Sequence, residues 1–157
     1  MRFPHKLILL ATLVSVVFLG GCEAEEQVLL ADGSTTQFGE WEGRWVLVNY
    51  WAEWCAPCRK EIPDLNRLHN ERASNGVVIV GVNYDGLKGE KLKSLVTEMN
   101  IDFPVLVEDP RLRWEQDSPS VLPTTLVIDP AGKLHDVLVG PHTYESFSAA
   151  LNITTEL

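Results

Sequence analysis

The sequence predicts one α/β domain, built on a central sheet that helices flank. Two apolar runs of strand length, 46–52 and 77–83, are continuous rather than alternating, which is typical of strands covered on both faces, as in a parallel sheet. Between them, Ile62, Leu65 and Leu68 recur at helical spacing, so this stretch is expected to be an amphipathic helix. The order strand, helix, strand forms a β-α-β unit, and 157 residues suffice for one such core but not for two.

The first 21 residues are predicted to be an export signal. Arg2 and Lys6 make a basic start, and the apolar run 7–19 is too short to span a bilayer about 30 Å thick, which takes roughly 20 helical residues. The run ends in Leu-Gly-Gly-Cys, which resembles a bacterial lipobox, in which the signal is cut before the cysteine and that cysteine carries lipid. Cys22 is therefore the predicted lipidation site, and residues 22–27 are the predicted lipid-anchored tether, of which 23–27 reach roughly 18 Å at most. The alternative is ordinary signal cleavage beside an incidental cysteine.

The globular domain is predicted to run from residue 28 to 157. It begins with a β-hairpin around Asp32-Gly33, a dipeptide typical of tight turns. After the β-α-β unit the pattern predicts a helix at 87–100, a short strand at 103–109, a helical turn at 111–116, a hairpin at 124–140 that turns at 129–132, and a last helix at 144–151. Thr143 is the expected N-cap of the last helix, and Pro63 is expected to kink the long one.

The charge balance is acidic, with 22 Asp and Glu residues against 13 Lys and Arg residues. Nucleic-acid binding, which needs clustered Lys and Arg, is therefore not supported. A lipid chain would hold such an acidic body at a membrane without basic residues, since each buried CH₂ contributes roughly 0.8 kcal/mol. Lipidation of Cys22 would leave Cys55 and Cys58 as the free pair of thiols, in a compartment outside the cytosol where disulfides persist.

Cys55-Ala-Pro-Cys58 stands at the start of the long predicted helix. Cysteines at this spacing can close a disulfide, and the helix N-terminus favours an anion on Cys55, so a lowered pKa and an attacking thiolate are expected. Cys58 would then resolve the mixed disulfide.

The alternatives are a metal site and two inert buried thiols. Zinc needs four ligands, and His69, His135 and His142 are scattered, so these histidines are assigned to the surface or to packing, and neither metal nor cofactor is expected.

Two segments together resemble a known family. "NYWAEWCAPCRKEIP", which contains both cysteines, is followed later in the chain by "VLPTTLVIDPAGK", and the pair resembles thioredoxin-like thiol-disulfide oxidoreductases, particularly the membrane-tethered TlpA and ResA branch. The resemblance covers nearly all of the domain. It implies a thioredoxin-like fold, with a four- or five-stranded mixed sheet flanked by helices and an extra helix and strand inserted before the C-terminal half, which 87–107 fits.

The same resemblance assigns residues to substrate binding. Pro123 matches the family's cis-proline, which lies beside the cysteines, keeps metals away and lets the preceding backbone, here Leu122, pair with an extended substrate strand. From the residues alone, Pro123 is a proline before a strand, and a trans loop proline is the alternative. Trp54 matches the aromatic residue beside the nucleophile and is a candidate substrate platform, with plain packing as its alternative.

Glu61 is the candidate proton carrier. It follows Cys58 by three positions and so shares the helix face of the inward thiol, where partial burial would raise its pKa and let it exchange protons with Cys58. ResA-like proteins have a Glu at this place with that role, whereas an exposed surface Glu is the alternative. Thioredoxin has an Asp on its central strand where this chain has Asn49, which cannot titrate, and this departure points to Glu61 as the main proton carrier.

These expectations combine into a lipid-anchored thiol-disulfide oxidoreductase on the periplasmic side of the bacterial envelope. It would act as a monomer, reduce disulfides in exported proteins and take electrons from a membrane dithiol donor. The Ala-Pro between the cysteines resembles the Gly-Pro of thioredoxin more than the Pro-His of strong oxidants, which favours the reducing direction. Two alternatives remain: a dedicated reductant of the haem-binding cysteines of apocytochrome c, and a non-catalytic binding module or metal chaperone.

Overall fold

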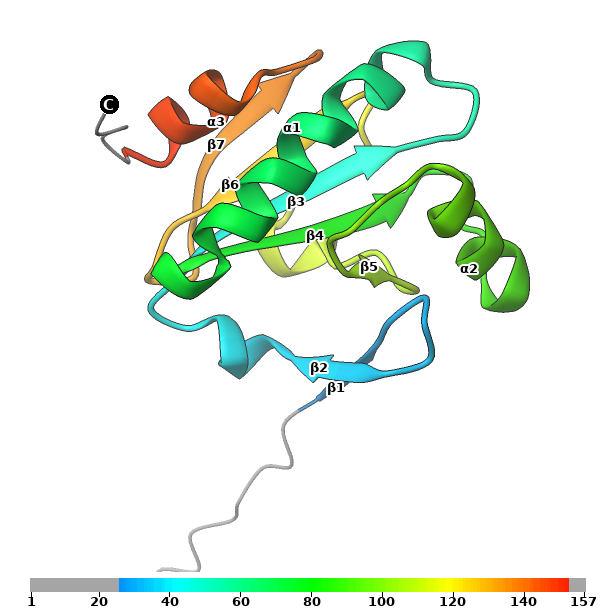
Figure 1. Ribbon diagram of the computed structural model, residues 1–157. Helices are drawn as coiled ribbons and strands as arrows, with labels where there is room; N and C mark the ends of the chain where they lie inside the picture. The colour runs from blue at the N-terminus through cyan, green and yellow to red at the C-terminus, as the bar shows by residue number, and fades with distance from the viewer. Residues whose placement is uncertain (1–25, 153–157) are drawn as a thin grey trace, which may run out of the picture.

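The computed structural model describes residues 26–152 (Figure 1). The predicted export signal and Cys22 lie outside these residues, as does most of the tether. The described strands are β1 (Gln27–Leu29), β2 (Thr35–Gln37), β3 (Trp45–Trp51), β4 (Val77–Asn83), β5 (Val105–Leu106), β6 (Thr124–Ile128) and β7 (Leu134–Val139), and the α-helices are α1 (Ala56–Arg72), α2 (Gly89–Glu98) and α3 (Tyr144–Ala150). In this part of the chain no helix is long and apolar enough to cross a membrane.

The centre of the fold is a five-stranded sheet with the order β5-β4-β3-β6-β7. β3 pairs in parallel with β4 across α1, and β4 in parallel with β5, whereas β6 runs antiparallel to both β3 and β7. The sheet is therefore mixed, as the resemblance implied, and α2 and β5 form the expected insertion between β4 and β6. β1 and β2 form the predicted N-terminal antiparallel hairpin.

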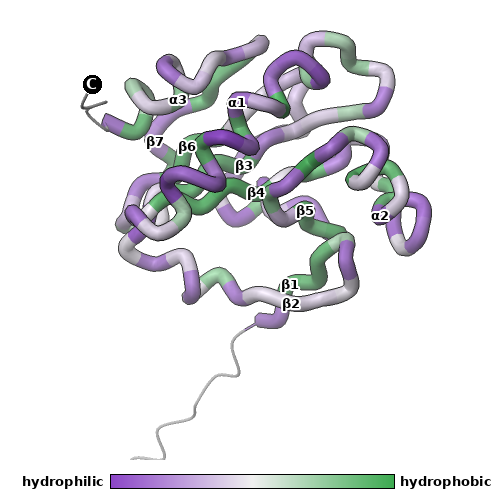
Figure 2. The backbone as a smooth tube through the Cα atoms, viewed as in Figure 1, coloured by the Kyte–Doolittle hydropathy of each residue, from purple (hydrophilic) through white to green (hydrophobic). Residues whose placement is uncertain are grey.

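Each face of the sheet buries its own apolar cluster, which explains the continuous hydrophobicity of β3 and β4. From β3, Leu47 and Trp51 join the cluster beneath the helices, whereas Val46, Val48 and Tyr50 join a second cluster on the opposite face. The second cluster is completed by residues of the N-terminal hairpin and the turn after it, such as Val28 and Trp41. Hydrophobic segments accordingly gather along the central strands (Figure 2).

The observed elements differ from the predicted ones mainly at their ends. β5 covers only Val105–Leu106 of the expected 103–109, because the hairpin takes over the pairing there: Val107 N–H donates to the Leu29 carbonyl at 3.0 Å. α1 continues as one helix through Pro63 and gives way to a 3₁₀ turn, Ala73–Asn75. A second 3₁₀ turn, Phe38–Trp41, follows the hairpin, and a third, Arg111–Trp114, lies within the helical turn predicted at 111–116.

The N-terminus of α3 has the predicted cap. The Thr143 hydroxyl accepts a hydrogen bond from the Ser146 N–H at 3.4 Å, and the Ser146 hydroxyl accepts one from the Thr143 N–H at 2.9 Å. Two of the N–H groups that a helix leaves unpaired at its start are thereby satisfied. This reciprocal pair fixes the point at which the loop after β7 enters α3.

Candidate active site

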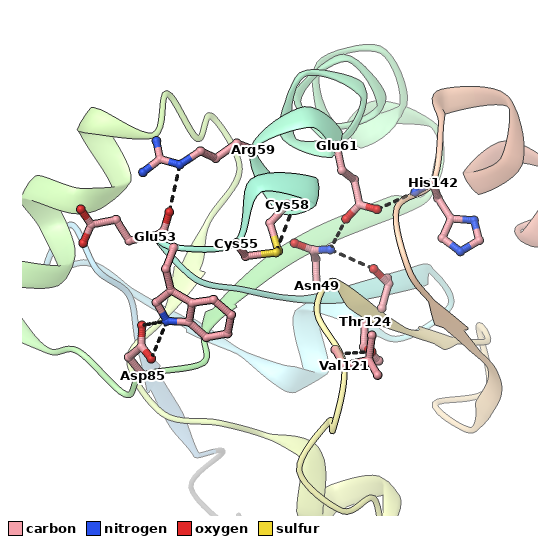
Figure 3. Close-up of a disulfide and its surroundings, with 12 residues drawn as sticks. Asn49, Glu53, Cys55, Cys58, Arg59, Glu61, Asp85, Val121, Thr124 and His142 are labelled. Atoms are coloured by element: carbon pink, nitrogen blue, oxygen red, sulfur yellow. Dashed lines mark hydrogen bonds between the residues drawn. A yellow bond between two sulfur atoms is a disulfide. The ribbon is translucent and has the colours of Figure 1, made fainter.

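Cys55 and Cys58 are joined by a disulfide at the N-terminus of α1 (Figure 3). Cys55 is the N-cap residue, and its sulfur accepts the Cys58 N–H at 3.2 Å. Pro57 sits in the first turn, where a proline costs no hydrogen bond because that N–H would have no helical partner. The sulfur of Cys55 therefore lies where the unpaired N–H groups and the helix dipole stabilise a negative charge.

The turn before α1 is held by short-range hydrogen bonds. β3 ends at Trp51, and the Cys55 N–H donates to the Ala52 carbonyl at 3.2 Å. The Arg59 guanidinium reaches back from α1 to the Glu53 carbonyl at 2.9 Å. Both cysteines join the apolar cluster beneath the helices and are nearly enclosed, with 3% of Cys55 and 1% of Cys58 exposed.

Pro123 follows a cis peptide bond from Leu122, as the resemblance implied. It directly precedes β6, whose first residue, Thr124, is paired with Tyr50 near the end of β3. Pro123 therefore lies at the same end of the strands as the loop that carries the cysteines. The Thr124 hydroxyl donates to the Val121 carbonyl at 2.8 Å. Val121 is exposed and Leu122 half-buried, so the segment that leads into the cis peptide bond is open to solvent at Val121.

Glu61 is buried, with 2% of its surface exposed, which rules out the surface alternative. One carboxylate oxygen, Oε1, accepts a hydrogen bond from the Asn49 side chain at 2.7 Å, and the other, Oε2, accepts the backbone N–H of His142 at 2.7 Å (Figure 3). Glu61 therefore connects α1 to β3 and to the loop before α3. The same helix face carries Cys58 one turn earlier.

Burial raises the pKa of Glu61 to about 7, against a usual value near 4.5. The hydrogen bonds from His142 and Asn49 act in the opposite direction, because they favour the ionised carboxylate, while the nearby negative charge of Asp64 adds to the rise. A carboxyl group that titrates near neutral pH is suited to both accepting and returning a proton.

The Asn49 side chain is buried and donates hydrogen bonds to two acceptors. Its Nδ2 group donates to Glu61 Oε1 and also to the Thr125 hydroxyl at 2.9 Å, and both Asn49 and Thr125 are 1% exposed. Asn49 and Thr125 are cross-strand partners on β3 and β6. The amide at the position of the titratable Asp of thioredoxin thus binds the buried carboxylate of Glu61.

Trp54 is largely exposed, with 66% of its surface accessible, so it is not a core residue. Its indole N–H lies 3.2 Å from each carboxylate oxygen of Asp85, and its ring meets Tyr84 edge-on at a centroid distance of 6.3 Å. Tyr84 is also exposed. The loop after β4 therefore supports an aromatic surface next to Cys55.

His69, His135 and His142 lie on different elements of the fold. His69 is half-buried on α1, where burial lowers its pKa, and His135 packs edge-on against Trp45. The His142 ring packs against Phe147 and lies near the Ser146 hydroxyl. Within residues 26–152, no group of three or more His, Cys, Asp and Glu side chains is placed to hold a metal ion.

Sequence reasoning missed three members of the site. The N–H of His142 contributes through the backbone, for which no sequence signal exists. Thr125 could have been found only by knowing the register of β3 and β6. Asp85 had a usable signal, because it follows the second of two neighbouring parallel strands, and the ends of such strands meet at one edge of the sheet.

A disulfide in CxxC spacing at the start of a helix, beside a cis-proline on a mixed sheet, defines the thioredoxin-like thiol-disulfide oxidoreductases. The chain belongs to the AhpC/TSA family, whose model matches residues 22–137. It is 30% identical over 149 residues to the thiol-disulfide oxidoreductase ResA of Bacillus subtilis (strain 168), an alignment that covers 90% of this chain and 83% of ResA.

Solved structures of thioredoxin-family proteins also resemble this chain. A thiol:disulfide interchange protein of the thioredoxin family from Chlorobium tepidum TLS is 28% identical, with a TM-score of 0.69 over 82% of this chain and 91% of that one. An exposed lipoprotein thioredoxin from Streptococcus pneumoniae strain TIGR4 is 25% identical, with a TM-score of 0.68 over 82% of this chain and 98% of that one. The chain is accordingly a thiol-disulfide oxidoreductase, so the non-catalytic reading is set aside.

Proposed function

We propose that the protein reduces disulfides in exported proteins while anchored by lipid at Cys22 to a membrane of the bacterial envelope, on its periplasmic side. The observation that carries the chemistry is the position of Glu61: a buried carboxyl group, titrating near neutral pH, one helical turn after Cys58. The reducing direction is supported by the Ala-Pro dipeptide between the cysteines.

The first step is attack by the Cys55 thiolate on a substrate disulfide. A sulfur–sulfur bond forms between Cys55 and one substrate sulfur, the substrate disulfide breaks, and the other substrate sulfur leaves as a thiolate that takes a proton from solvent. The N-terminus of α1 stabilises the attacking thiolate. Attack requires a nearly linear approach along the bond that breaks, so the substrate must enter at the small exposed part of Cys55.

The second step releases the other half of the substrate. Glu61, in its ionised form, takes the proton of the Cys58 thiol, and the resulting thiolate attacks the sulfur of Cys55. The Cys55–Cys58 disulfide forms, the mixed disulfide breaks, and the departing substrate thiolate is protonated, the proton held by Glu61 being returned to it or to solvent. In sum, two electrons pass from the two cysteines to the substrate disulfide. The two substrate thiolates take up two protons, and the ionisation of Cys55 and Cys58 releases two, so the protons balance through solvent and Glu61.

The enzyme is returned to its dithiol form by a dithiol donor in the membrane. That donor reduces the Cys55–Cys58 disulfide and becomes a disulfide itself, so the electron count closes. No other redox group is needed in this scheme, since both half-reactions are thiol-disulfide exchange.

Substrate binding is assigned to the surface around Cys55. Leu122, ahead of Pro123, would offer its backbone to an extended substrate segment, as in strand addition to an exposed edge. Trp54 would contact apolar substrate side chains, and its exposure beside the loop that carries Tyr84 and Asp85 supports this role. The protein would act as a monomer.

Anchoring is supported by the lipobox-like end of the signal and by the likeness to an exposed lipoprotein thioredoxin. Changing Cys22 to Ala should release the protein from the membrane fraction without altering its redox activity in solution. Metabolic labelling with a palmitate analogue gives the direct readout. Labelling that persists in the Cys22→Ala variant would contradict the assignment.

The test of catalysis is to trap the mixed disulfide. Cys58→Ser removes the resolving thiol, so substrates should stay bonded to Cys55 and appear as reducible high-mass species in envelope preparations. The matched control is Cys55→Ser with Cys58 intact, which should trap little because Cys58 is 1% exposed. Equal trapping by both variants would reverse the roles of the cysteines, and none by either would refute the assignment.

Direction is tested by the reduction potential in a glutathione redox buffer. A reductase should lie near thioredoxin, at about −270 mV, rather than near strong oxidants at about −120 mV. In the presence of dithiothreitol the wild-type protein should also accelerate the reduction of insulin, and Cys55→Ser should not. A potential near that of the strong oxidants would overturn the reductase reading.

A further inference from the structure

We infer that the Asn49 side chain and the His142 backbone N–H form a two-donor cradle, which positions the Glu61 carboxylate and sets the pH range in which it can take the proton of Cys58. The inference rests on the proposed function, because it requires Glu61 to exchange a proton with Cys58. Asn49 and His142 are positioning residues here, since they act through Glu61.

The first argument is the geometry of the two hydrogen bonds. Each carboxylate oxygen of Glu61 accepts one donor at 2.7 Å, a short distance typical of hydrogen bonds to a charged group. The two donors come from separate elements, β3 and the loop before α3, so they hold the carboxylate from two directions (Figure 3). A buried carboxyl group with only 2% exposure has few other ways to keep one orientation.

The second argument is that the donor from β3 is itself fixed. The Nδ2 group of Asn49 carries two hydrogens, and Glu61 and the Thr125 hydroxyl each accept one. The amide thus cannot rotate away from Glu61 without losing a buried bond on the neighbouring strand. The donor of the loop is fixed in the same way, because the next residue, Thr143, is locked in the cap of α3.

The third argument concerns where the proton can go. Each carboxylate oxygen of Glu61 can accept two hydrogen bonds, and the cradle occupies one acceptor position on each oxygen. A position therefore stays free for a proton, while both donors can remain bonded to oxygen. The cradle favours the ionised carboxylate, in opposition to burial, and so holds the titration of Glu61 near neutrality instead of letting it rise further.

The groups around Glu61 are few and identifiable. α1 contributes the Cys58 thiol and the charged Asp64, β3 contributes the Asn49 amide, which Thr125 of β6 fixes, and the loop before α3 contributes the His142 N–H. The His142 imidazole packs against Phe147 instead. In the oxidised protein Cys58 does not titrate. A carboxyl signal that titrates near neutral pH in that form can therefore be assigned to Glu61 by its loss in Glu61→Gln.

The experiment removes the donors one at a time. Asn49→Leu removes the side-chain donor at similar volume, and His142→Pro removes the backbone donor. The carboxyl-carbon NMR signal of Glu61 is followed against pH in the oxidised protein, and folding is checked by circular dichroism. Each variant should raise the titration midpoint by about 1 to 2 pH units, as expected for the loss of one hydrogen bond to a charged group.

Two control variants distinguish the loss of a hydrogen bond to Glu61 from a general disturbance of the structure. His142→Ala loses the imidazole but retains the backbone N–H, and should keep the wild-type midpoint. Tyr50→Phe changes the residue next to Asn49 on β3, whose side chain belongs to the opposite face of the sheet, and should keep it too. If Asn49→Leu does not fold, Asn49→Ala removes the same donor without adding apolar bulk.

A second readout links the cradle to catalysis. The mixed disulfide formed between Cys55 and a nitrothiobenzoate group releases a coloured thiolate when Cys58 attacks, and the pH profile of that release should move upward with the NMR midpoint. Midpoints within about 0.3 pH unit of wild type in both Asn49→Leu and His142→Pro would overturn the cradle. An equal shift in His142→Ala would also overturn it, because the backbone N–H would then not be the cause.

The two proposals fail in different ways. If the Glu61 titration midpoints shift but the pH profile of nitrothiobenzoate release does not, the cradle does not act on Cys58. Glu61 would then not carry the proton of Cys58 in the proposed function. Absence of any release from the wild-type mixed disulfide would refute the proposed resolving step itself, whatever the NMR midpoints show.

Discussion

The backbone N–H of Gly140 donates a hydrogen bond to the carbonyl oxygen of Pro123 at a distance of 2.9 Å. Two residues later, the N–H of His142 binds Glu61. The short loop between β7 and α3 therefore holds the cis-proline on one side of the site and the buried carboxylate on the other. The two parts of the site belong to one hydrogen-bonded unit, although they are far apart in the sequence.

The burial of Glu61 should make the stability of the oxidised protein depend on pH. The unfolded chain loses this proton near pH 4.5 and the folded chain near pH 7, so between these values the folded state binds more protons and the free energy of unfolding falls as pH rises. The expected fall is about 3 kcal/mol, measured by urea denaturation from pH 4 to 8.

Glu61→Gln is the control for this pH dependence. Gln has no titrating group, so the difference in unfolding free energy between wild type and variant should change across this window in favour of the variant at the higher pH. Only the change with pH counts, because Gln also alters the hydrogen bonds from Asn49 and His142. Parallel curves for the two proteins would mean that Glu61 ionises at its ordinary pKa.

Trp54→Ala should weaken substrate binding without unfolding the protein. The side chain is exposed, so its removal should change the unfolding free energy by less than about 0.5 kcal/mol, while the loss of an aromatic contact should raise KM for a disulfide peptide about 10-fold. Asp85→Asn, which weakens the bond to the indole N–H, should have a smaller effect in the same direction.

The control for Trp54 is Leu29→Ala. Leu29 is also a large exposed apolar side chain, but it belongs to the N-terminal hairpin, away from the start of α1 (Figure 1). Its KM should equal that of wild type. A rise in KM for Leu29→Ala as large as that for Trp54→Ala would show that the effect does not come from contact at the active site.

Gly81→Ala should destabilise the fold. A Cβ atom at Gly81 would lie 2.9 Å from Trp51 Nε1, 3.0 Å from Phe103 Cε2 and 3.1 Å from Val105 Cγ2, closer than packed side chains allow. The expected cost of this overpacking is about 1 to 3 kcal/mol, seen as a lower Tm. An unchanged Tm would show that these neighbours can move apart freely, and Phe103→Leu in the same chain should recover part of any loss.

Tyr50→Phe should cost stability but not activity. The Tyr50 hydroxyl donates to Asp109 at 2.8 Å from a buried position, so its removal should lower the unfolding free energy by about 1 kcal/mol. Tyr50 belongs to the apolar cluster on the face opposite the helices, so kcat for insulin reduction should not change. A loss of kcat would indicate coupling across β3.

The fold was predictable to the extent that it depends on local patterns. The apolar run at 77–83 coincides with β4, and the Thr143 cap and the N-terminal hairpin were found from short motifs. The length of β5 was not predictable, because a hydrogen bond from Val107 to the distant Leu29 carbonyl replaces the pairing with β4 there. Local sequence carries no information about such competition between partners.

The site also has features that follow from local sequence and contacts that depend on tertiary packing. Cys58 and Glu61 share a helix, so their common face and the burial of Glu61 followed from a spacing of three residues. The contacts of Glu61 with Asn49 and His142 depend instead on how α1 packs over β3 and on the path of the loop after β7. The substitution of Asn for Asp pointed to Glu61, but gave no sign that the two side chains touch.

The two edge strands of the sheet bear on how readily one copy of the protein could pair with another. The hairpin covers the β5 edge, where Leu30 bridges to Leu106. The β7 edge carries an extra residue, His135, opposite Val127 and Ile128, and the exposed charge of Asp136. Bulges and charges on edge strands discourage pairing with another chain, so neighbouring copies are kept from joining their sheets into aggregates.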